Sequence, residues 1–209
     1  MTANDASDHN YRGEYDNLVR FASYFCQIDL VRSLSPRSVL EVGIGSRTVS
    51  NYLRQQGFEV TTCDIDASRQ PDHVADVRSL PFADGSYDLV MACEVLEHIP
   101  WQDVDAATAQ LARVSRRHVL ISLPYLSLYF EAALRFPLAR AVSKTRVWDI
   151  CLRLPWFFRR CSPSHCWEIG MKGYPLRKVR TLLRRHLNIR REVRPVLNPK
   201  QHFFVLEKP

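Results

Sequence analysis

The sequence lacks any run of about 18 apolar residues, although 46% of its 209 residues are hydrophobic. We therefore expect no membrane span. The first ten residues are polar and acidic, without the basic flank and apolar stretch of a signal peptide. These absences favour a cytoplasmic protein in which residues 1–209 form one domain around a hydrophobic core.

Paired cysteines at metal-binding spacings are also absent. Most of the six cysteines are scattered singly in apolar settings, which is typical of buried free thiols. Cys161 and Cys166 are closer together, with His165 between them. No second pair completes the four ligands of a structural zinc site, so we expect no metal.

Glycine is scarce, yet two of the seven glycines fall in one turn, Glu41-Val42-Gly43-Ile44-Gly45-Ser46. A buried strand is predicted before this turn and a helix after it, at 47–56. Gly43 and Gly45 allow a tight turn and the close approach of a ligand, and the helix presents free N–H groups there. A nicotinamide dehydrogenase would need a third glycine where Thr48 stands. Taken alone, the turn is also compatible with an ordinary strand-to-helix connection.

The order of apolar segments predicts an α/β fold, a Rossmann-like doubly wound and mainly parallel sheet. Strands are expected at 38–43, 58–63, 73–77, 87–92 and 118–123, and helices at 11–33, 47–56 and 103–115. The apolar face expected for the first helix consists of Leu18, Phe21, Ala22, Phe25, Ile28 and Val31. Beyond Pro124 we expect a helical cap over 125–173, a helix over 175–187, and an antiparallel strand pair at 189–196 and 202–207.

Acidic side chains follow the second and third predicted strands. Asp64 comes 19 residues after Gly45, close to the spacing at which a carboxylate accepts both hydroxyls of a ribose. Asp66 is the alternative, but it also suits the cap of a short helix. Asp76 is placed to accept an adenine amino group, beside the backbone N–H of Val77. The structural alternative is that Asp64 only forms a turn and that Asp76 is a solvated loop residue without a ligand.

After the fourth strand, His98 falls about one helical turn beyond Glu94. Imidazole titrates near neutral pH, so His98 is a candidate base for an acceptor hydroxyl. A histidine that only packs on the helix surface is the alternative.

Five motifs occur together in a familiar order. They are Val39-Leu40-Glu41-Val42-Gly43-Ile44-Gly45-Ser46, Cys63-Asp64-Ile65-Asp66, Asp76-Val77-Arg78-Ser79-Leu80-Pro81-Phe82, Ser86-Tyr87-Asp88-Leu89-Val90 and Glu94-Val95-Leu96-Glu97-His98-Ile99. Through them the chain resembles the small class I S-adenosylmethionine-dependent methyltransferases of the type 11-like group. The resemblance covers roughly residues 37–123.

The resemblance implies a seven-stranded sheet with a C-terminal antiparallel pair, and S-adenosylmethionine as cofactor. It places Glu41, Gly43, Gly45, Asp64, Asp76, Val77 and Cys93 around this cofactor, and we add Ile65 and Arg47 as further candidates. Glu41 and the glycines would surround the methionine part, and Arg47, where the family carries small residues, would meet its carboxylate. His165, followed by an aromatic-acidic pair, would line the acceptor side as a second catalytic candidate. Helix capping by Ser164 or Glu168 is the structural alternative there.

Charge is distributed unevenly between two parts of the chain. Residues 1–134 carry 11 Lys/Arg and 18 Asp/Glu, whereas residues 135–200 carry 17 Lys/Arg and 3 Asp/Glu. The basic, aromatic-rich segment after Pro124 is expected to select a small-molecule, glycan or lipid-linked acceptor. Contact of the segment 135–194 with an anionic membrane, at the inner membrane surface, is the second interpretation.

Nucleic acid is the least favoured partner, since Ala92-Cys93-Glu94-Val95 lacks the Pro-Pro-aromatic signature of DNA amino-methylating enzymes. The predicted function is methyl transfer to oxygen from S-adenosylmethionine. A non-catalytic nucleotide- or S-adenosylmethionine-binding module for regulation or assembly is the alternative.

Overall fold

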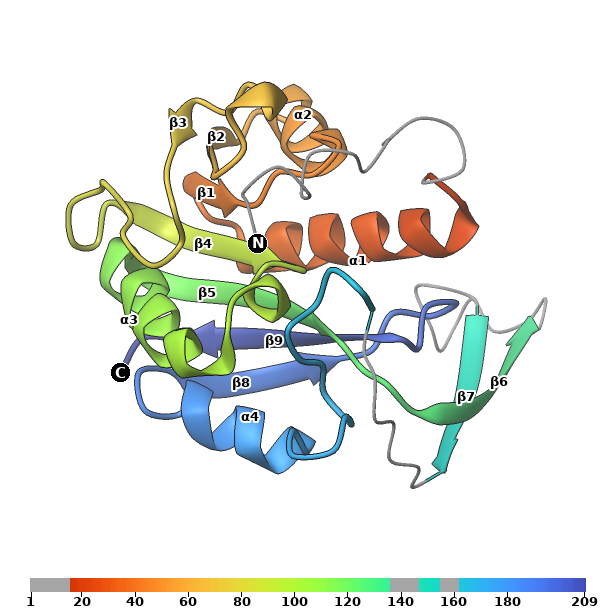
Figure 1. Cartoon of the computed structure of the whole chain (residues 1–209). Helices are drawn as coiled ribbons and strands as arrows, with labels where there is room; N and C mark the ends of the chain where they lie inside the picture. Colours follow the sequence, from red (N-terminus) through yellow and green to blue (C-terminus); the bar gives the residue numbers. More distant parts are fainter. Residues whose placement is uncertain (1–15, 136–146, 155–161) are drawn as a thin grey trace.

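The computed structural model describes residues 16–135, 147–154 and 162–209. Its centre is a seven-stranded sheet in the order β3-β2-β1-β4-β5-β9-β8 (Figure 1). The strands are β1 (Ser38–Val42), β2 (Glu59–Asp64), β3 (His73–Val74), β4 (Tyr87–Cys93), β5 (Ser115–Pro124), β8 (Asn188–Val193) and β9 (Gln201–Glu207). Strands β1 to β5 pair in parallel, and β9 runs antiparallel to both β5 and β8. The predicted doubly wound sheet with a C-terminal antiparallel pair is confirmed.

Four α-helices cover the two faces of this sheet: α1 (Leu18–Leu34), α2 (Thr48–Gln55), α3 (Val104–Val114) and α4 (Leu176–Leu183). Three short 3-10 helices, η1 (Ala67–Arg69), η2 (Leu96–His98) and η3 (Trp101–Asp103), lie in the connections. Apolar residues of α1 and α2 form one core cluster with the sheet, and those of α3 and α4 form the other. Figure 1 shows α1 and α4 on different sides of the strands.

The alternation of side chains along β1 explains both cores. Val39 packs in the cluster of α1 and α2, whereas Leu40 and Val42 pack in the cluster of α3 and α4. All three are almost completely buried. A central parallel strand is covered on both faces, so neighbouring positions such as Val39 and Leu40 are both apolar instead of alternating with polar residues.

The helical cap predicted over 125–173 is wrong where the structure describes it. Strands β6 (Leu128–Arg135) and β7 (Val147–Leu154) instead form a separate antiparallel two-stranded sheet. An apolar run this short fits a strand as well as a helix, and pairing of the two segments settled their conformation. The parts of the predicted cap at 136–146 and 155–161, which include Cys161, lie outside the described residues.

The apolar face predicted for the first helix is also largely wrong. Leu18, Phe21 and Phe25 are exposed, whereas the buried residues of α1 are Ser23, Gln27, Leu30 and Val31. The helix packs through its C-terminal half, and the buried Ser23 accepts a hydrogen bond of 2.6 Å from the Asn198 amide. Partnered polar groups are tolerated in a core, so tertiary contacts overrode the apolar periodicity here.

Within the described part of the chain, no helix combines the length and the hydropathy that a membrane span requires.

Candidate functional site

Three predicted site segments meet at the carboxyl edge of the sheet. Strand β1 pairs with β2 on one side and with β4 on the other, so Val42 lies opposite both Cys63 and Ala92. The residues that follow these three positions, Gly43, Asp64 and Cys93, therefore lie side by side. The Gly43 N–H donates to the Cys63 carbonyl at 2.8 Å, which ties the turn to the end of β2.

The two glycines of the turn are required for different reasons. Gly43 has φ +78°, and a Cβ added to it would lie 2.3 Å from Cγ2 of Val95. Gly45 has φ +50°, but a Cβ there would meet no atom within 4 Å. Gly43 thus permits close packing against the segment after β4, whereas Gly45 borders open space in which a ligand can approach the backbone.

Asp64 is held rigidly in this turn. It is 7% exposed, and its carboxylate accepts N–H bonds of 2.9 Å from Ile44 and from Asp66. Neighbouring Ile65 is 68% exposed, an apolar side chain turned out of the core beside the turn. Asp66 caps η1 by accepting from the Ser68 N–H at 2.9 Å, so the capping alternative describes this residue.

Asp76 and Val77 follow β3. The carboxylate of Asp76 accepts from the Arg78 N–H at 2.8 Å and from the Arg78 guanidinium at 2.6 Å. These hydrogen bonds from Arg78 hold the pKa of Asp76 below its ordinary value. Val77 is buried in the core, so only its backbone is available to a ligand.

Arg47 stands at the start of α2, where the chain turns away from the glycines. It adopts a left-handed conformation with φ +63°, an unfavourable backbone for a residue with a side chain. Its guanidinium Nε is buried and has no hydrogen-bond partner within the described residues. A buried cationic nitrogen of this kind favours an anion such as a carboxylate beside it.

Two buried groups near the strand ends have altered pKa values. Burial raises the pKa of the Glu41 carboxyl to about 7. The thiol of Cys93 is likewise raised well above its ordinary pKa, first by burial and then by the charges of Glu41 and Glu94. Cys93 is therefore a neutral thiol and not a nucleophile.

The two candidate catalytic histidines lie together, although they are far apart in the sequence. The rings of His98 and His165 make an edge-to-face contact with centroids 4.8 Å apart. The Nδ1 atom of His98 is 2.9 Å from the Ser164 carbonyl, and the Nδ1 atom of His165 is 2.6 Å from Oε1 of Glu168. Trp167, expected beside them at the acceptor, is fully buried instead.

Three residues that the fold brings to this edge were not predicted from the sequence. The Tyr24 hydroxyl of α1 lies 2.9 Å from the Ser46 hydroxyl of the glycine turn. Arg69 donates to the Gly45 carbonyl at 3.1 Å. Glu97, beside His98, is fully buried. None of them has a motif of its own, and only the position of Glu97 within the Glu94-to-Ile99 segment could have drawn attention to it.

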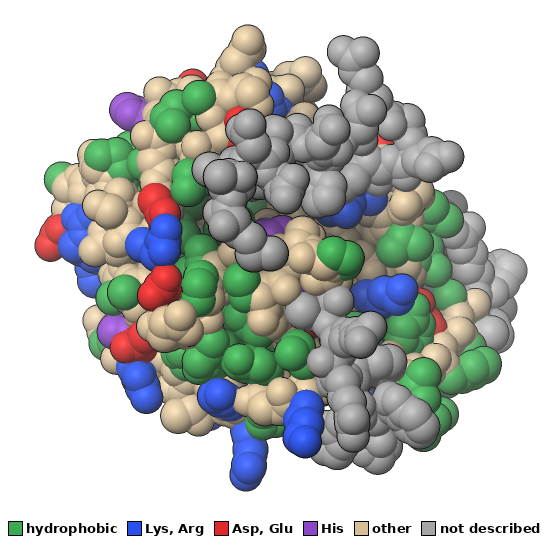
Figure 2. Space-filling model, viewed as in Figure 1, with side chains coloured by type: hydrophobic (Ala, Val, Ile, Leu, Met, Phe, Trp, Pro, Cys, Tyr) green, Lys and Arg blue, Asp and Glu red, His purple; other side chains and the backbone are tan. Residues whose placement is uncertain are grey.

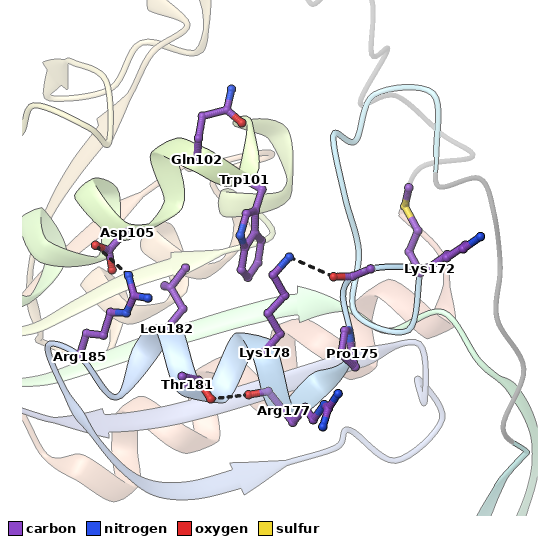
Figure 3. A pocket seen from close by; sticks show the side chains of 12 residues that line it. Trp101, Gln102, Asp105, Lys172, Pro175, Arg177, Lys178, Thr181, Leu182 and Arg185 are labelled. Carbon is purple, nitrogen blue, oxygen red and sulfur yellow. Dashed lines mark hydrogen bonds and ion pairs between the residues drawn. The ribbon is translucent and has the colours of Figure 1, made fainter.

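A large basic hollow lies elsewhere, between η3, α3 and α4 (Figure 3). It measures about 1430 Å³, and its lining includes Lys172, Arg177, Lys178 and Arg185. The Lys178 ammonium sits 4.7 Å from the centre of the Trp101 ring. Figure 2 shows Lys and Arg side chains along the lower margin of the molecule, where α4 runs. No residue of the predicted cofactor set lines this hollow, so it is distinct from the glycine turn.

Comparison with known proteins agrees with this geometry. Residues 40–123 match a family model described as a methyltransferase domain. The chloroplastic magnesium protoporphyrin IX methyltransferase of Arabidopsis thaliana is 27% identical over 117 residues, which cover 48% of this chain. The match spans only 36% of the length of that relative.

Solved structures share the fold over most of the chain. Magnesium protoporphyrin IX methyltransferase (ChlM) from Synechocystis PCC 6803 with bound SAM has a TM-score of 0.60 at 16% identity, covering 95% of this chain and 88% of that one. The N-methyltransferase NodS from Bradyrhizobium japonicum WM9 with S-adenosylhomocysteine has a TM-score of 0.58 at 15% identity, covering 98% and 94%. At these identities the likeness establishes the architecture alone.

Proposed function

We propose that this protein, whose residues 40–123 match the model of a methyltransferase domain, belongs to the class I S-adenosylmethionine-dependent family and transfers a methyl group from that cofactor to a small-molecule acceptor. The observation that carries the proposal is the meeting of the glycine turn, Asp64 and Cys93 at one edge of the sheet. Ligands of doubly wound sheets bind at this edge. When bound, the cofactor supplies a methyl group on a positively charged sulfur.

The described residues fit this cofactor. Gly45 borders open space, which leaves room for the ligand against the turn. The buried Nε of Arg47 suits the carboxylate of the methionine part. Burial raises the pKa values of Glu41 and Glu94, and a neighbouring cation would favour their ionised forms. A sulfonium is such a cation.

The adenosine end is assigned to the ends of β2 and β3. Asp64 uses some of its lone pairs on backbone N–H groups and retains others for the ribose hydroxyls. The exposed Ile65 offers an apolar surface for the adenine ring. Asp76 accepts from the adenine amino group, and the Val77 N–H donates to the ring.

The acceptor is proposed to bind beside His98 and His165 and to be methylated on oxygen. A hydroxyl is a poor nucleophile until its proton leaves, and an imidazole beside the acceptor is suited to accept that proton. Small-molecule, glycan and lipid-linked acceptors all carry such hydroxyls. The basic side chains of the hollow, which include Lys178 and Arg185, suit an anionic group of the acceptor or an anionic membrane surface.

Titration calorimetry with S-adenosylmethionine and S-adenosylhomocysteine tests the cofactor assignment. We expect both to bind competitively, and Asp64→Asn to weaken each at least tenfold. Asp29→Asn, which changes an exposed acid of α1, is the matched control and should bind as the parent protein does. If neither compound binds at millimolar concentration, the proposal fails.

The alternative function, a non-catalytic S-adenosylmethionine-binding module, predicts the same calorimetry. Methyl-labelled S-adenosylmethionine incubated with a small-molecule extract distinguishes the two. We expect the labelled methyl group to appear in an extract component only when the protein is present. Binding without any transfer would favour the regulatory or assembly role.

A further inference from the structure

Two loops join to form a cluster of ligating side chains next to the proposed acceptor site. The first contains η2, which presents Glu97 and His98 after β4, and the second contains His165. Backbone and ring contacts fasten them together: the Cys166 N–H donates to the Glu97 carbonyl at 2.7 Å, and the Trp167 indole donates to the Leu96 carbonyl at 3.1 Å. The cluster is therefore fixed by the packed core and not by mobile side chains alone.

The ligating atoms of the cluster are close enough to share one metal ion. One carboxylate oxygen of Glu97 and one ring nitrogen each of His98 and His165 all lie within 4.8 Å of one another. Bonds of about 2.0–2.2 Å to a tetrahedral ion separate neighbouring ligands by roughly 3.3 Å. Small side-chain rotations would bring the three atoms to that separation.

The surroundings of both histidines resemble those of metal ligands. The Nδ1–H of His98 donates to the Ser164 carbonyl, and Nδ1 of His165 contacts the Glu168 carboxylate. Partners of this kind fix the tautomer in which Nε2 binds the ion.

Glu97 is the observation that most directly indicates a ligand. Its side chain is 0% exposed, and neither carboxylate oxygen has a hydrogen-bond partner among the residues that the structure describes. A buried carboxylate without a partner is costly in free energy, and coordination of a cation removes that cost.

We propose that Glu97, His98 and His165 bind a divalent transition-metal ion, with zinc as the representative ion. Two imidazoles and one carboxylate suit zinc and its neighbours, whereas magnesium prefers oxygen ligands alone. Three protein ligands leave at least one coordination position for another molecule. The sequence predicted no metal because no second pair accompanies the Cys161-to-Cys166 spacing, whereas this cluster unites residues that are distant in the chain.

The function of the ion rests on the proposed methyl transfer, but its binding does not. An acceptor hydroxyl placed on the open position would have a lower pKa, so its proton leaves to solvent near neutral pH. Its oxygen then forms the bond to the methyl carbon while the methyl–sulfur bond breaks, with the electron pair remaining on sulfur. His98 and His165 thus act as ligands and not as free bases, and the acceptor class is a hydroxyl compound.

Metal binding by the full chain, stripped with a chelator, tests the proposal without any methyl acceptor. Titration with Zn²⁺ is expected to show one site, and Co²⁺ to give visible absorption typical of nitrogen and oxygen ligands. His98→Ala, His165→Ala and Glu97→Gln are each expected to weaken binding at least tenfold. Glu168→Gln, which alters the support of His165 without removing a ligand, is expected to weaken it by about 10–100-fold.

His186→Ala is the matched control, because His186 also pairs with a carboxylate, that of Asp105 at 3.1 Å, but lies outside the cluster. It should bind Zn²⁺ as the parent does. Because Glu97 is buried, its variant is first checked for cooperative thermal unfolding; the exposed His98 supplies a variant that preserves the core. Absence of a stoichiometric site, or binding that none of the three ligand variants weakens, overturns the proposal. Loss of S-adenosylmethionine binding would leave this result untouched and would overturn only the methyl-transfer function.

Discussion

Substitution of the two glycines on either side of α2 separates backbone strain from close packing at the site. Gly43 and Gly57 have similar positive φ angles of +78° and +87°. An alanine at either position therefore carries a similar left-handed strain, about 1–2 kcal/mol. Only at Gly43 does the new Cβ also meet a neighbour, Cγ2 of Val95 at 2.3 Å. Gly57→Ala, with nothing within 4 Å, is thus a control for the strain alone.

The extra cost at Gly43 follows from the stiffness of the valine. A Val side chain has one strongly preferred rotamer in many settings and no flexible end to move aside. Forcing it away costs about 1–3 kcal/mol as overpacking. For a chain of this length each kcal/mol lowers the melting temperature by about 2–4 °C. We expect Gly43→Ala to melt correspondingly lower than Gly57→Ala, and to bind S-adenosylmethionine more weakly, because the turn and the segment after β4 are pushed apart.

Thermal unfolding and cofactor titration of both variants measure these differences. Adding Val95→Ala to Gly43→Ala removes the contacted methyl group and should restore part of the lost stability, a coupling of about 0.5–3 kcal/mol. Equal losses in Gly43→Ala and Gly57→Ala would refute the packing argument, as would a double variant in which the two losses simply add.

Three further predictions concern single groups. Arg47→Gly relieves the left-handed strain and should raise stability by about 1 kcal/mol, yet weaken S-adenosylmethionine binding; unchanged affinity in calorimetry would remove the carboxylate role of Arg47. The pKa of Glu41 is raised by burial from 4.5 to about 7, so its stabilising, protonated form is lost as pH rises through this window. Glu41→Gln should therefore flatten the decline of unfolding free energy between pH 4.5 and 7, measured in denaturant, and an unaltered profile would contradict the assignment. Asn198→Ala leaves the buried hydroxyl of Ser23 without its 2.6 Å donor and should cost about 1–3 kcal/mol, whereas the exposed Asn188→Ala should cost little.

The alternation of apolar and polar segments was sufficient to predict the central sheet. The strands that end at Val42, Asp64 and Cys93 were predicted to within one or two residues, because each apolar run is bounded by turn residues and alternates with a helical segment. Gly43 and Gly45 were identified as turn residues because both are glycines between a strand and a helix. Both have the positive φ angles that only glycine adopts easily. Local chemistry dictated these features, so local sequence revealed them.

Elsewhere the sequence pattern was ambiguous or misleading. The segments that form β6 and β7 fitted a helix as well as a strand, and their pairing with each other decided the outcome. On α1 the most apolar residues, such as Phe21 and Phe25, are exposed while Ser23 and Gln27 are buried. A helix alone does not specify which neighbours will satisfy its polar side chains.

The sequence by itself therefore determined a doubly wound sheet with a glycine turn after its first strand, and it identified Asp64 as the acid beside that turn. Only the tertiary structure brought Glu97, His98 and His165 together, because ligand geometry depends on which loops pack against each other and not on spacing along the chain. The same holds for the hollow between α3 and α4, which forms where Trp101, Gln102 and Asp105 meet the basic segment 171–185. Sheet periodicity is a local property, whereas a cluster of side chains from distant loops exists only after the core has packed.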